Sequence, residues 1–229
     1  MKVGIMQPYF MPYIGYFQLM KAVDKYVVYD DVNYIKGGWV SRNNLLENGE
    51  RKMFTIILKG ASPNKLFNEI EIGDDFRKFI KTLQLNYSKS QYFNQVMQVL
   101  EKIFSYPNKQ LALFLANSYV EIMKYLGIKT EILISSNLAK DNDLKGKSKV
   151  LDICHLLGAD TYYNAIGGIN LYDKSEFKEN MIDLKFLKTE FKEYPQNAKT
   201  FVPGLSIIDV LMNNSKEETN YLLDSFVLI

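Results

Sequence analysis

The 229-residue chain contains one histidine and one cysteine, and this scarcity excludes several kinds of chemistry. A lone cysteine cannot form an intramolecular disulfide, which agrees with a reducing cytoplasm. Cys154 and His155 lie in the apolar stretch ICHLLG, so we expect both to pack in or beside the core. Catalysis by serine–histidine or cysteine–histidine groups and histidine-rich zinc sites are therefore not expected.

The chain also lacks an excess of one charge and any long apolar run. Its 28 basic and 26 acidic residues give a net charge of +2, which provides no basic face for duplex nucleic acid. No segment approaches the roughly 18 apolar residues of a membrane span. The opening MKVGIMQPYF does not resemble a signal peptide. We expect a cytoplasmic protein whose partner is a small molecule, with no nucleic acid and no membrane span.

Strand and helix patterns alternate along the chain. Lys2–Met6, a helical pattern from Ile14 to Val23, and Tyr26–Tyr29 form a strand–helix–strand opening. Helical spacing extends from Asp75 to about Leu126. Further strands are expected at 53–58, 69–72, 129–134, 161–163 and 183–186, and further helices at 148–157, 172–180 and 206–212. The pattern predicts an α/β fold with a mostly parallel sheet flanked by helices. We expect a single domain over residues 1–229, in which the helical block 75–126 is an insertion or covers the sheet.

Polar segments follow the first two strands, where parallel sheets bind ligands. In QPYFMPYIGY, Gly15 would let a helix start lie close to a ligand, and its backbone N–H groups would favour an anion. In DDVNYIKGGWVSRNN, Asp30 and Asp31 end a strand, and Arg42 could bind phosphate or carboxylate through two hydrogen bonds. Solvated loops and core turns are the alternative interpretation of both segments.

Three later segments add candidates. The run KGKSK precedes a helix and could bind phosphate through Lys147. The loop NAIGG follows a strand, and its glycines would allow close backbone approach. Tyr194 and Gln196 lie in a loop before Ser206, which we expect to cap a helix together with Asp209.

These segments together resemble the WbqC-like family. The matching pieces, in order, are QPYFMPYIGYF, DDVNYIKGGWVSRNN, KSKVLDICHLLGADTYY, the GG loop with LYD, EYPQ and FVPGLSIIDVLMNN. The resemblance implies bacterial O-antigen or related surface-polysaccharide biosynthesis, and transfer of glycine to an amino sugar has been proposed for the family. Asn164 stands where the family usually has a serine, so the activity or substrate here could differ. The opening is also similar to that of nucleotidylyltransferases, but Tyr13-Ile14-Gly15-Tyr16 lacks the histidines of their HxGH motif.

The resemblance leads to a first hypothesis: transfer of a small acyl group, such as glycyl, to the amine of a nucleotide-linked amino sugar. Asp30 or Asp31 would take the proton from the ammonium or orient it. The donor is unknown and could be ATP-derived, a thioester or a charged carrier. The candidate substrate-binding residues are Gln7, Pro8, Tyr13, Gly15, Tyr16, Asn33, Lys36, Arg42, Asn43, Lys147, Asn164, Gly167, Gly168, Tyr194 and Gln196.

Two other hypotheses remain open from the sequence. A protein without a reactive histidine or cysteine could bind a sugar nucleotide, or serve as a scaffold, without doing chemistry. Alternatively, Asp30 and Asp31 could hold Mg²⁺ against a diphosphate in a nucleotidyltransferase or glycosyltransferase.

Overall fold

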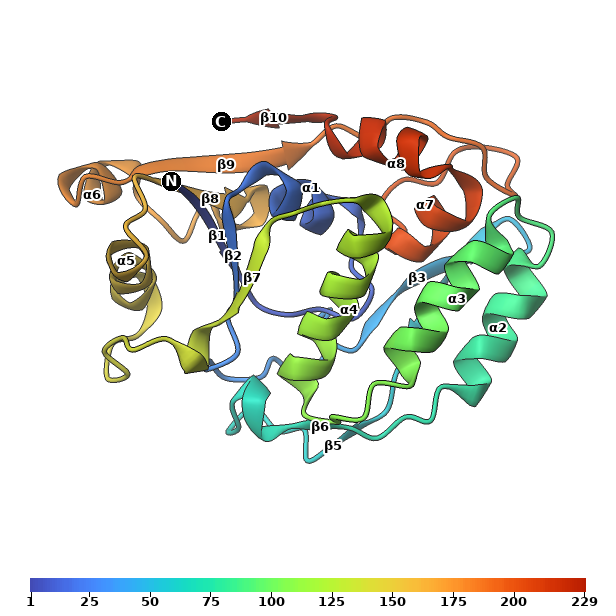
Figure 1. Cartoon of the computed structure of the whole chain (residues 1–229), viewed down its shortest axis with the longest axis horizontal. Helices are drawn as coiled ribbons and strands as arrows, with labels where there is room; N and C mark the ends of the chain where they lie inside the picture. The colour runs from blue at the N-terminus through green and yellow to red at the C-terminus, as the bar shows by residue number, and fades with distance from the viewer.

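A six-stranded sheet forms the centre of the computed structural model, which describes residues 1–229 (Figure 1). The strand order is β10-β9-β8-β1-β2-β7, and every neighbouring pair is parallel except the edge pair β9–β10. The strands are β1 (Lys2–Met6), β2 (Lys25–Val28), β7 (Glu131–Ile134), β8 (Thr161–Ala165), β9 (Asp183–Thr189) and β10 (Phe226–Leu228). The predicted α/β class with a mostly parallel sheet is confirmed.

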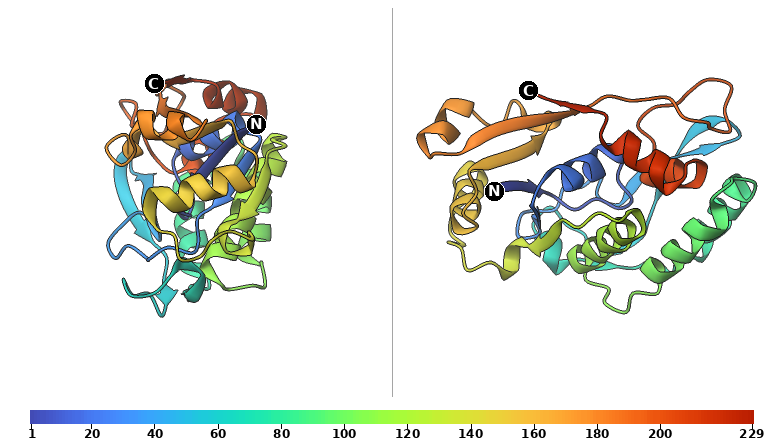
Figure 2. Two further views of the ribbon diagram at one scale, coloured as in Figure 1. Left: turned by 90° about the vertical axis from the view of Figure 1, so that its left-hand side faces the viewer. Right: turned by 45° about the horizontal axis from the view of Figure 1, so that its top comes forward.

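Alternation along the strands divides the core between the two faces of the sheet. In β2, Tyr26 and Val28 belong to the larger hydrophobic cluster, whereas Val27 belongs to the smaller one. The larger cluster includes residues of α1 (Ile14–Ala22), α4 (Leu111–Leu126), α7 (Ile207–Asn213) and α8 (Lys216–Leu223). The smaller cluster includes residues of α5 (Gly146–Leu156) and α6 (Lys174–Glu179). The sheet therefore lies between two helical layers, as Figure 2 shows from two directions.

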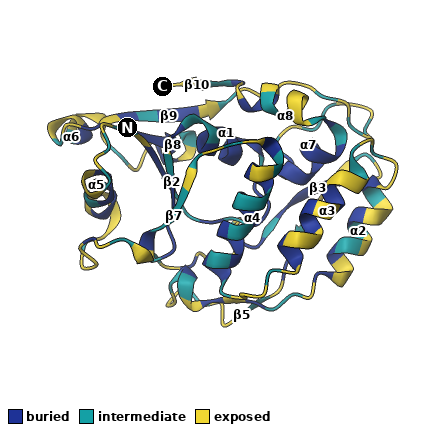
Figure 3. Cartoon of the chain, in the orientation of Figure 1, coloured by how far each residue is buried: buried dark blue, intermediate teal, exposed yellow.

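The predicted helical block forms α2 (Arg77–Tyr87), α3 (Phe93–Phe104) and α4. Helix α4 contacts β7, and α3 packs between α4 and α7. Figure 3 shows buried inner faces and exposed outer faces on α2 and α3, as expected for amphipathic helices. Only α4 of this block contacts the sheet closely, while α2 and α3 extend the larger core away from it.

The structure differs from the predictions at several boundaries. The polar loop after β2 ends earlier than expected, because a hairpin of β3 (Arg42–Glu47) and β4 (Glu50–Thr55) begins there. Helix α5 begins at Gly146, not at Ser148, and the polar tail forms α8 and β10. The shorter elements are β5 (Leu58–Lys59), β6 (Glu71–Ile72), η1 (Phe67–Glu69), η2 (Ser135–Asn137) and η3 (Ile166–Gly168).

Chain order across the sheet reverses beside β1. From β1 the chain moves to β2 and then β7 on one side, and later to β8 and β9 on the other. The carboxyl ends of β1 and β2 are neighbours, so the two polar segments that follow them leave the same edge of the sheet. Ligands bind at this edge in folds of this type. None of the helices has the length and apolar character needed to cross a membrane.

Candidate functional site

The two aspartates at the end of β2 have different environments. Asp30 is fully buried, and its carboxylate accepts hydrogen bonds from the backbone N (2.9 Å) and Oγ (2.7 Å) of Ser136. Burial raises the pKa of Asp30, although these hydrogen bonds act in the opposite direction. Asp30 therefore ties the end of β2 to η2, the turn that follows β7.

Asp31 faces two lysines. Its Oδ2 lies 2.6 Å from Nζ of Lys140 and 2.9 Å from Nζ of Lys149, and both lysine side chains are almost fully buried. Burial alone would raise the pKa of the Asp31 carboxyl, but hydrogen bonds from Lys140, Ser135 and Lys149 outweigh it, so the pKa is lowered. The other oxygen, Oδ1, is enclosed and lacks a well-formed hydrogen bond. Asp31 is thus an ionised carboxylate held chiefly through one of its oxygens.

A cavity of about 530 Å³, which we call the edge pocket, opens beside Asp31. This volume lies within the roughly 300–1,000 Å³ typical of small-molecule sites. Its walls come from the ends of β2 and β7, the loop before η1 and the start of α5. The lining residues are Tyr29, Asp31, Val32, Asn33, Leu66, Asn68, Ser136, Asn142, Leu144, Lys145, Gly146 and Lys149.

The start of α5 makes one wall of the edge pocket suited to an anion. The first backbone N–H groups of any helix lack an intrahelical partner. In α5, whose N-cap residue is Lys145, no side chain caps them either. Lys145 and Lys149 are four residues apart and line the same cavity. Free N–H groups, the helix dipole and nearby ammonium groups together favour phosphate. Lys147, the predicted phosphate contact, instead pairs with Glu176 at 2.8 Å.

A second cavity of about 220 Å³, which we call the aromatic pocket, forms after β1. It brings together three of the predicted residues, Tyr13, Tyr16 and Asn43. The close approach predicted at Gly15 is occupied by the protein itself, because a Cβ there would lie 2.4 Å from the ring of Tyr13. The lining residues are Tyr9, Pro12, Tyr13, Tyr16, Trp39, Asn43, Asn44, Arg51 and Gly204.

Several predicted residues near the sheet edge line neither pocket. The backbone O of Gln7 accepts a hydrogen bond from the Tyr16 hydroxyl at 3.3 Å. The Arg42 guanidinium lies over the ring of Trp39 at 5.8 Å, and its Nε has no partner. Lys36 is exposed, and Pro8 is buried.

The GG loop after β8 is filled by a neighbouring side chain. Asn164 is buried, and a Cβ at Gly168 would lie 2.5 Å from its Nδ2. Gly167 is exposed, with nothing near the position that a Cβ would take. The close approach that the glycine pair allows is therefore made by Asn164.

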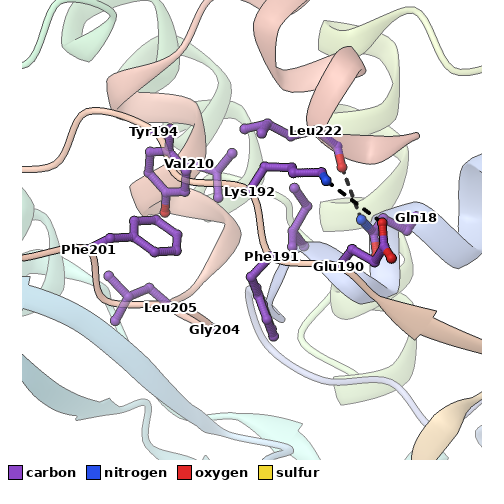
Figure 4. A pocket seen from close by; sticks show the side chains of 11 residues that line it. Gln18, Glu190, Phe191, Lys192, Tyr194, Phe201, Gly204, Leu205, Val210 and Leu222 are labelled. Atoms are coloured by element: carbon purple, nitrogen blue, oxygen red, sulfur yellow. Dashed lines mark hydrogen bonds and ion pairs between the residues drawn. The ribbon is translucent and has the colours of Figure 1, made fainter. Parts of the chain in front are cut away.

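Tyr194 and Gln196 bind a buried carboxylate. Asp209 Oδ1 accepts hydrogen bonds from the Tyr194 hydroxyl (2.8 Å) and from Nε2 of Gln196 (3.0 Å), while Oδ2 accepts one from the Tyr87 hydroxyl (2.7 Å). This cluster holds the segment after β9 onto α7. Ser206 caps this helix as predicted, but Asp209 does not complete the cap, because its carboxylate binds the cluster instead. Figure 4 shows the adjoining cavity beside Tyr194 and Phe201. Its volume of about 20 Å³ has room for a water molecule but not for a substrate.

The aspartate pair does not fit the predicted Mg²⁺ site. Asp30 uses its carboxylate on Ser136, and Asp31 already faces two ammonium groups. No group of three or more acidic, histidine or cysteine residues is placed to hold a metal ion. The donor set therefore gives no support to metal-bound diphosphate at Asp30 and Asp31.

The edge pocket contains residues that were absent from the candidate set, chiefly Tyr29, Asn68, Ser136, Lys145 and Lys149. The four-residue spacing of Lys145 and Lys149 was the available signal, since it places both on one face of a helix. For Asn68 the sequence offers no comparable signal, because only the folded chain brings η1 beside β2.

Comparison with known proteins gives a family and one distant relative. The model of the WbqC-like protein family matches residues 7–221. The uncharacterized protein Rv1507c of Mycobacterium tuberculosis (strain ATCC 25618 / H37Rv) is 28% identical over 227 residues, which cover 96% of this chain and 97% of the relative. No solved structure matches the chain.

Proposed function

The chain belongs to the WbqC-like protein family, and on that premise we propose that it acts on a precursor of bacterial surface polysaccharide. In this proposal a nucleotide-linked amino sugar binds in the edge pocket, and a small acyl group such as glycyl is transferred to its amine in the cytosol. The resemblance to the family supplies the biological context, and the edge pocket supplies the binding chemistry.

One observation carries the proposal: an anion site and the carboxylate residue Asp31 line the same cavity. The uncapped start of α5 and Lys145 would bind the diphosphate. The carboxylate of Asp31 would accept a hydrogen bond from the amine. A nucleotide-linked amino sugar carries both of the complementary groups, separated by a sugar ring.

The environment of Asp31 suits it to orient the amine. Its lowered pKa keeps the carboxylate ionised but makes it a weak base. In the transfer, the ammonium first releases one proton to solvent. The amine nitrogen then forms a bond to the acyl carbon, the bond from that carbon to the donor's leaving group breaks, and a second proton leaves with that group. Asp30 is enclosed and bound to Ser136, so we assign the amine to Asp31 alone.

Binding without catalysis is a second candidate function. Asp31 is the one carboxylate that lines the edge pocket, and its ion pairs with Lys140 and Lys149 lower its pKa. A carboxylate with a lowered pKa is a weak base, which favours binding over catalysis. The two functions share the ligand and differ in turnover, so a mass-spectrometric assay with activated glycyl donors separates them.

The test of the site compares two ligands that differ only at the amine. Calorimetric titration with a uridine-diphosphate-linked 2-amino sugar should give a dissociation constant about tenfold lower than with its N-acetylated form, because only the free ammonium adds a charge-assisted hydrogen bond to Asp31. Uridine diphosphate alone should still bind. Equal affinity for the free and acetylated sugars would contradict the assignment of the amine to Asp31.

A further inference from the structure

The aromatic pocket borders the loop that follows β1, the strand beside which the chain order across the sheet reverses. The loop after β1 supplies Tyr9, Pro12 and Tyr13 to its wall, and β1 is the strand with the outgoing pair β2–β7 on one side and β8–β9 on the other. In open α/β sheets the crevice at this reversal point is where nucleotides bind. The aromatic pocket is separate from the edge pocket, since the two share no lining residue.

One side-chain amide in the aromatic pocket makes no hydrogen bond within the protein. Asn44 is only 7% exposed, and its backbone groups bond to Asn43 Oδ1 and to the backbone N of Ser206. Its side-chain amide makes no hydrogen bond in the protein and lines the cavity. The neighbouring Asn43 amide is engaged, donating to the backbone O of Met11 at 2.7 Å and accepting from Asn44. The Asn44 amide is not one of the chain's fully enclosed unpaired groups, so it is accessible to a molecule in the cavity and offers both a donor and an acceptor to a ligand's polar edge.

The rest of the wall is aromatic. Trp39 is half exposed at the rim, and the Arg42 guanidinium lies at 5.8 Å from the centre of its ring. Tyr13 and Tyr16 pack edge to face with each other. Arg51 adds a positive charge, and no carboxylate lines the cavity. These walls suit a flat ring that bears, or lies next to, a negative charge.

We infer that the aromatic pocket binds the adenine base of a nucleotide. Its volume of about 220 Å³ is below the roughly 300 Å³ at which drug-sized sites begin, so it suits one ring system. A base needs hydrogen bonds only along its edge, while its faces stack on aromatic side chains.

The amide of Asn44 selects among the bases. Asparagine pairs with adenine through two hydrogen bonds, the amide O accepting from N6 and the amide N donating to N7. Arg51 would then meet a phosphate attached to the nucleoside. The contacts of this pocket alone lead to adenine as the base. The assignment of the nucleotide to the acyl donor rests on the proposed function, because ATP-derived and coenzyme A donors both carry adenosine.

The only tryptophan of the chain lies in this wall, so binding can be read directly from its fluorescence. Adenosine 5′-monophosphate should quench Trp39 emission saturably, with a dissociation constant about tenfold or more below that of uridine 5′-monophosphate. ATP, coenzyme A or both should displace it, which identifies the source of the base. Absence of saturable quenching, equal affinity for the two monophosphates, or displacement by neither adenosine compound would overturn the inference.

The variant Asn44→Asp removes the amide donor with little change in shape. It should weaken adenosine monophosphate binding about tenfold or more, whereas Asn94→Asp, the same change on the exposed surface of α3, should not. Circular dichroism verifies folding, and Arg51→Met, at an exposed residue, gives a second variant that does not disturb the core. Unchanged binding by both pocket variants would count against this site. The assay uses no amino sugar, so its outcome is independent of the edge-pocket titration.

Discussion

Nζ of Lys149 lies 2.9 Å from Oδ2 of Asp31, and both side chains are at least nine-tenths enclosed. Lys140, whose side chain is fully buried, contacts the same oxygen at 2.6 Å. Lys149 also donates to the backbone O of Asp31 at 3.0 Å. One carboxylate therefore balances two buried ammonium groups where the edge pocket meets the sheet.

The substitution Asp31→Asn should lower the free energy of unfolding by about 3 kcal/mol. It leaves Lys140 and Lys149 buried without a counter-charge, and breaking a buried ion pair from one side commonly costs about 3–5 kcal/mol. Urea unfolding followed by circular dichroism measures the change. Asp143→Asn is the matched control, since residue 143 is exposed. A loss no greater than that of the control would show that the lysines find other partners.

The substitution Gly15→Ala should destabilise the protein by about 1–2 kcal/mol and weaken ligand binding in the aromatic pocket. The new Cβ would lie 2.4 Å from the Tyr13 ring, so the ring must leave its place in the wall of the aromatic pocket. This crowding outweighs the gain of up to about 1 kcal/mol that alanine brings to a helix.

The control for this experiment is Gly167→Ala, because no atom lies within 4 Å of a Cβ at residue 167. Thermal unfolding and Trp39 fluorescence together report on both effects. A Gly15→Ala variant that is as stable as wild type and has unchanged fluorescence would show that the Tyr13 ring is not fixed in this position.

Local patterns in the sequence were sufficient for the sheet and its edge. The run KVGIM and the helical spacing after Ile14 predicted β1 and α1, and the parallel pairing of β1 with β2 confirmed that both polar segments leave one edge. Hairpin β3–β4 was missed, because Asn43 and Asn44 look like loop residues. Their burial depends on distant partners such as the backbone O of Met11. No local pattern contains such a contact.

The tail illustrates a signal that was present but unused. Ser215 and Glu218 form a capping box at the start of α8, and this pattern is readable from sequence. The pairing of Tyr194 and Gln196 with Asp209 is different in kind. These residues were expected at a ligand, and the structure gives them a buried carboxylate whose position depends on α7.

The contribution of Asp209 to stability should fall as the pH rises from the ordinary pKa of aspartate to the higher pKa that Asp209 has in the folded protein. Burial raises the pKa of Asp209 in the folded protein, although the hydrogen bonds from Tyr87, Tyr194 and Gln196 act in the opposite direction. The pKa of an aspartate in the unfolded chain is about 3.9. Between this value and the higher pKa of the folded protein, the folded state binds more protons than the unfolded state. Stability then decreases with increasing pH across that interval.

The measurement for Asp209 compares wild type with Asp209→Asn, in which this group no longer titrates. The difference in unfolding free energy, wild type minus variant, should decrease with pH and become level above the interval. An increase with pH would mean that the three hydrogen bonds outweigh the effect of burial.

Two lysines at the start of α5, the N-cap residue Lys145 and Lys147, provide a matched test of the phosphate site. Lys145 lines the edge pocket, whereas Lys147 pairs with Glu176, and both are exposed. Lys145→Ala should weaken binding of uridine diphosphate about five- to tenfold, as expected for the loss of one charge-assisted hydrogen bond. Lys147→Ala removes the same charge from the start of the same helix. Because Lys147 does not line the edge pocket, the dissociation constant should change by less than about twofold.

Calorimetry at two salt concentrations completes this comparison. If Lys145 contacts phosphate directly, its substitution should also reduce the salt dependence of binding, because one fewer charge pair is screened. Equal losses in the two variants would indicate a general effect of net charge. A larger loss for Lys147→Ala would place the phosphate on the other side of α5, beside Glu176 and Lys174, and would remove the edge pocket from the proposed reaction.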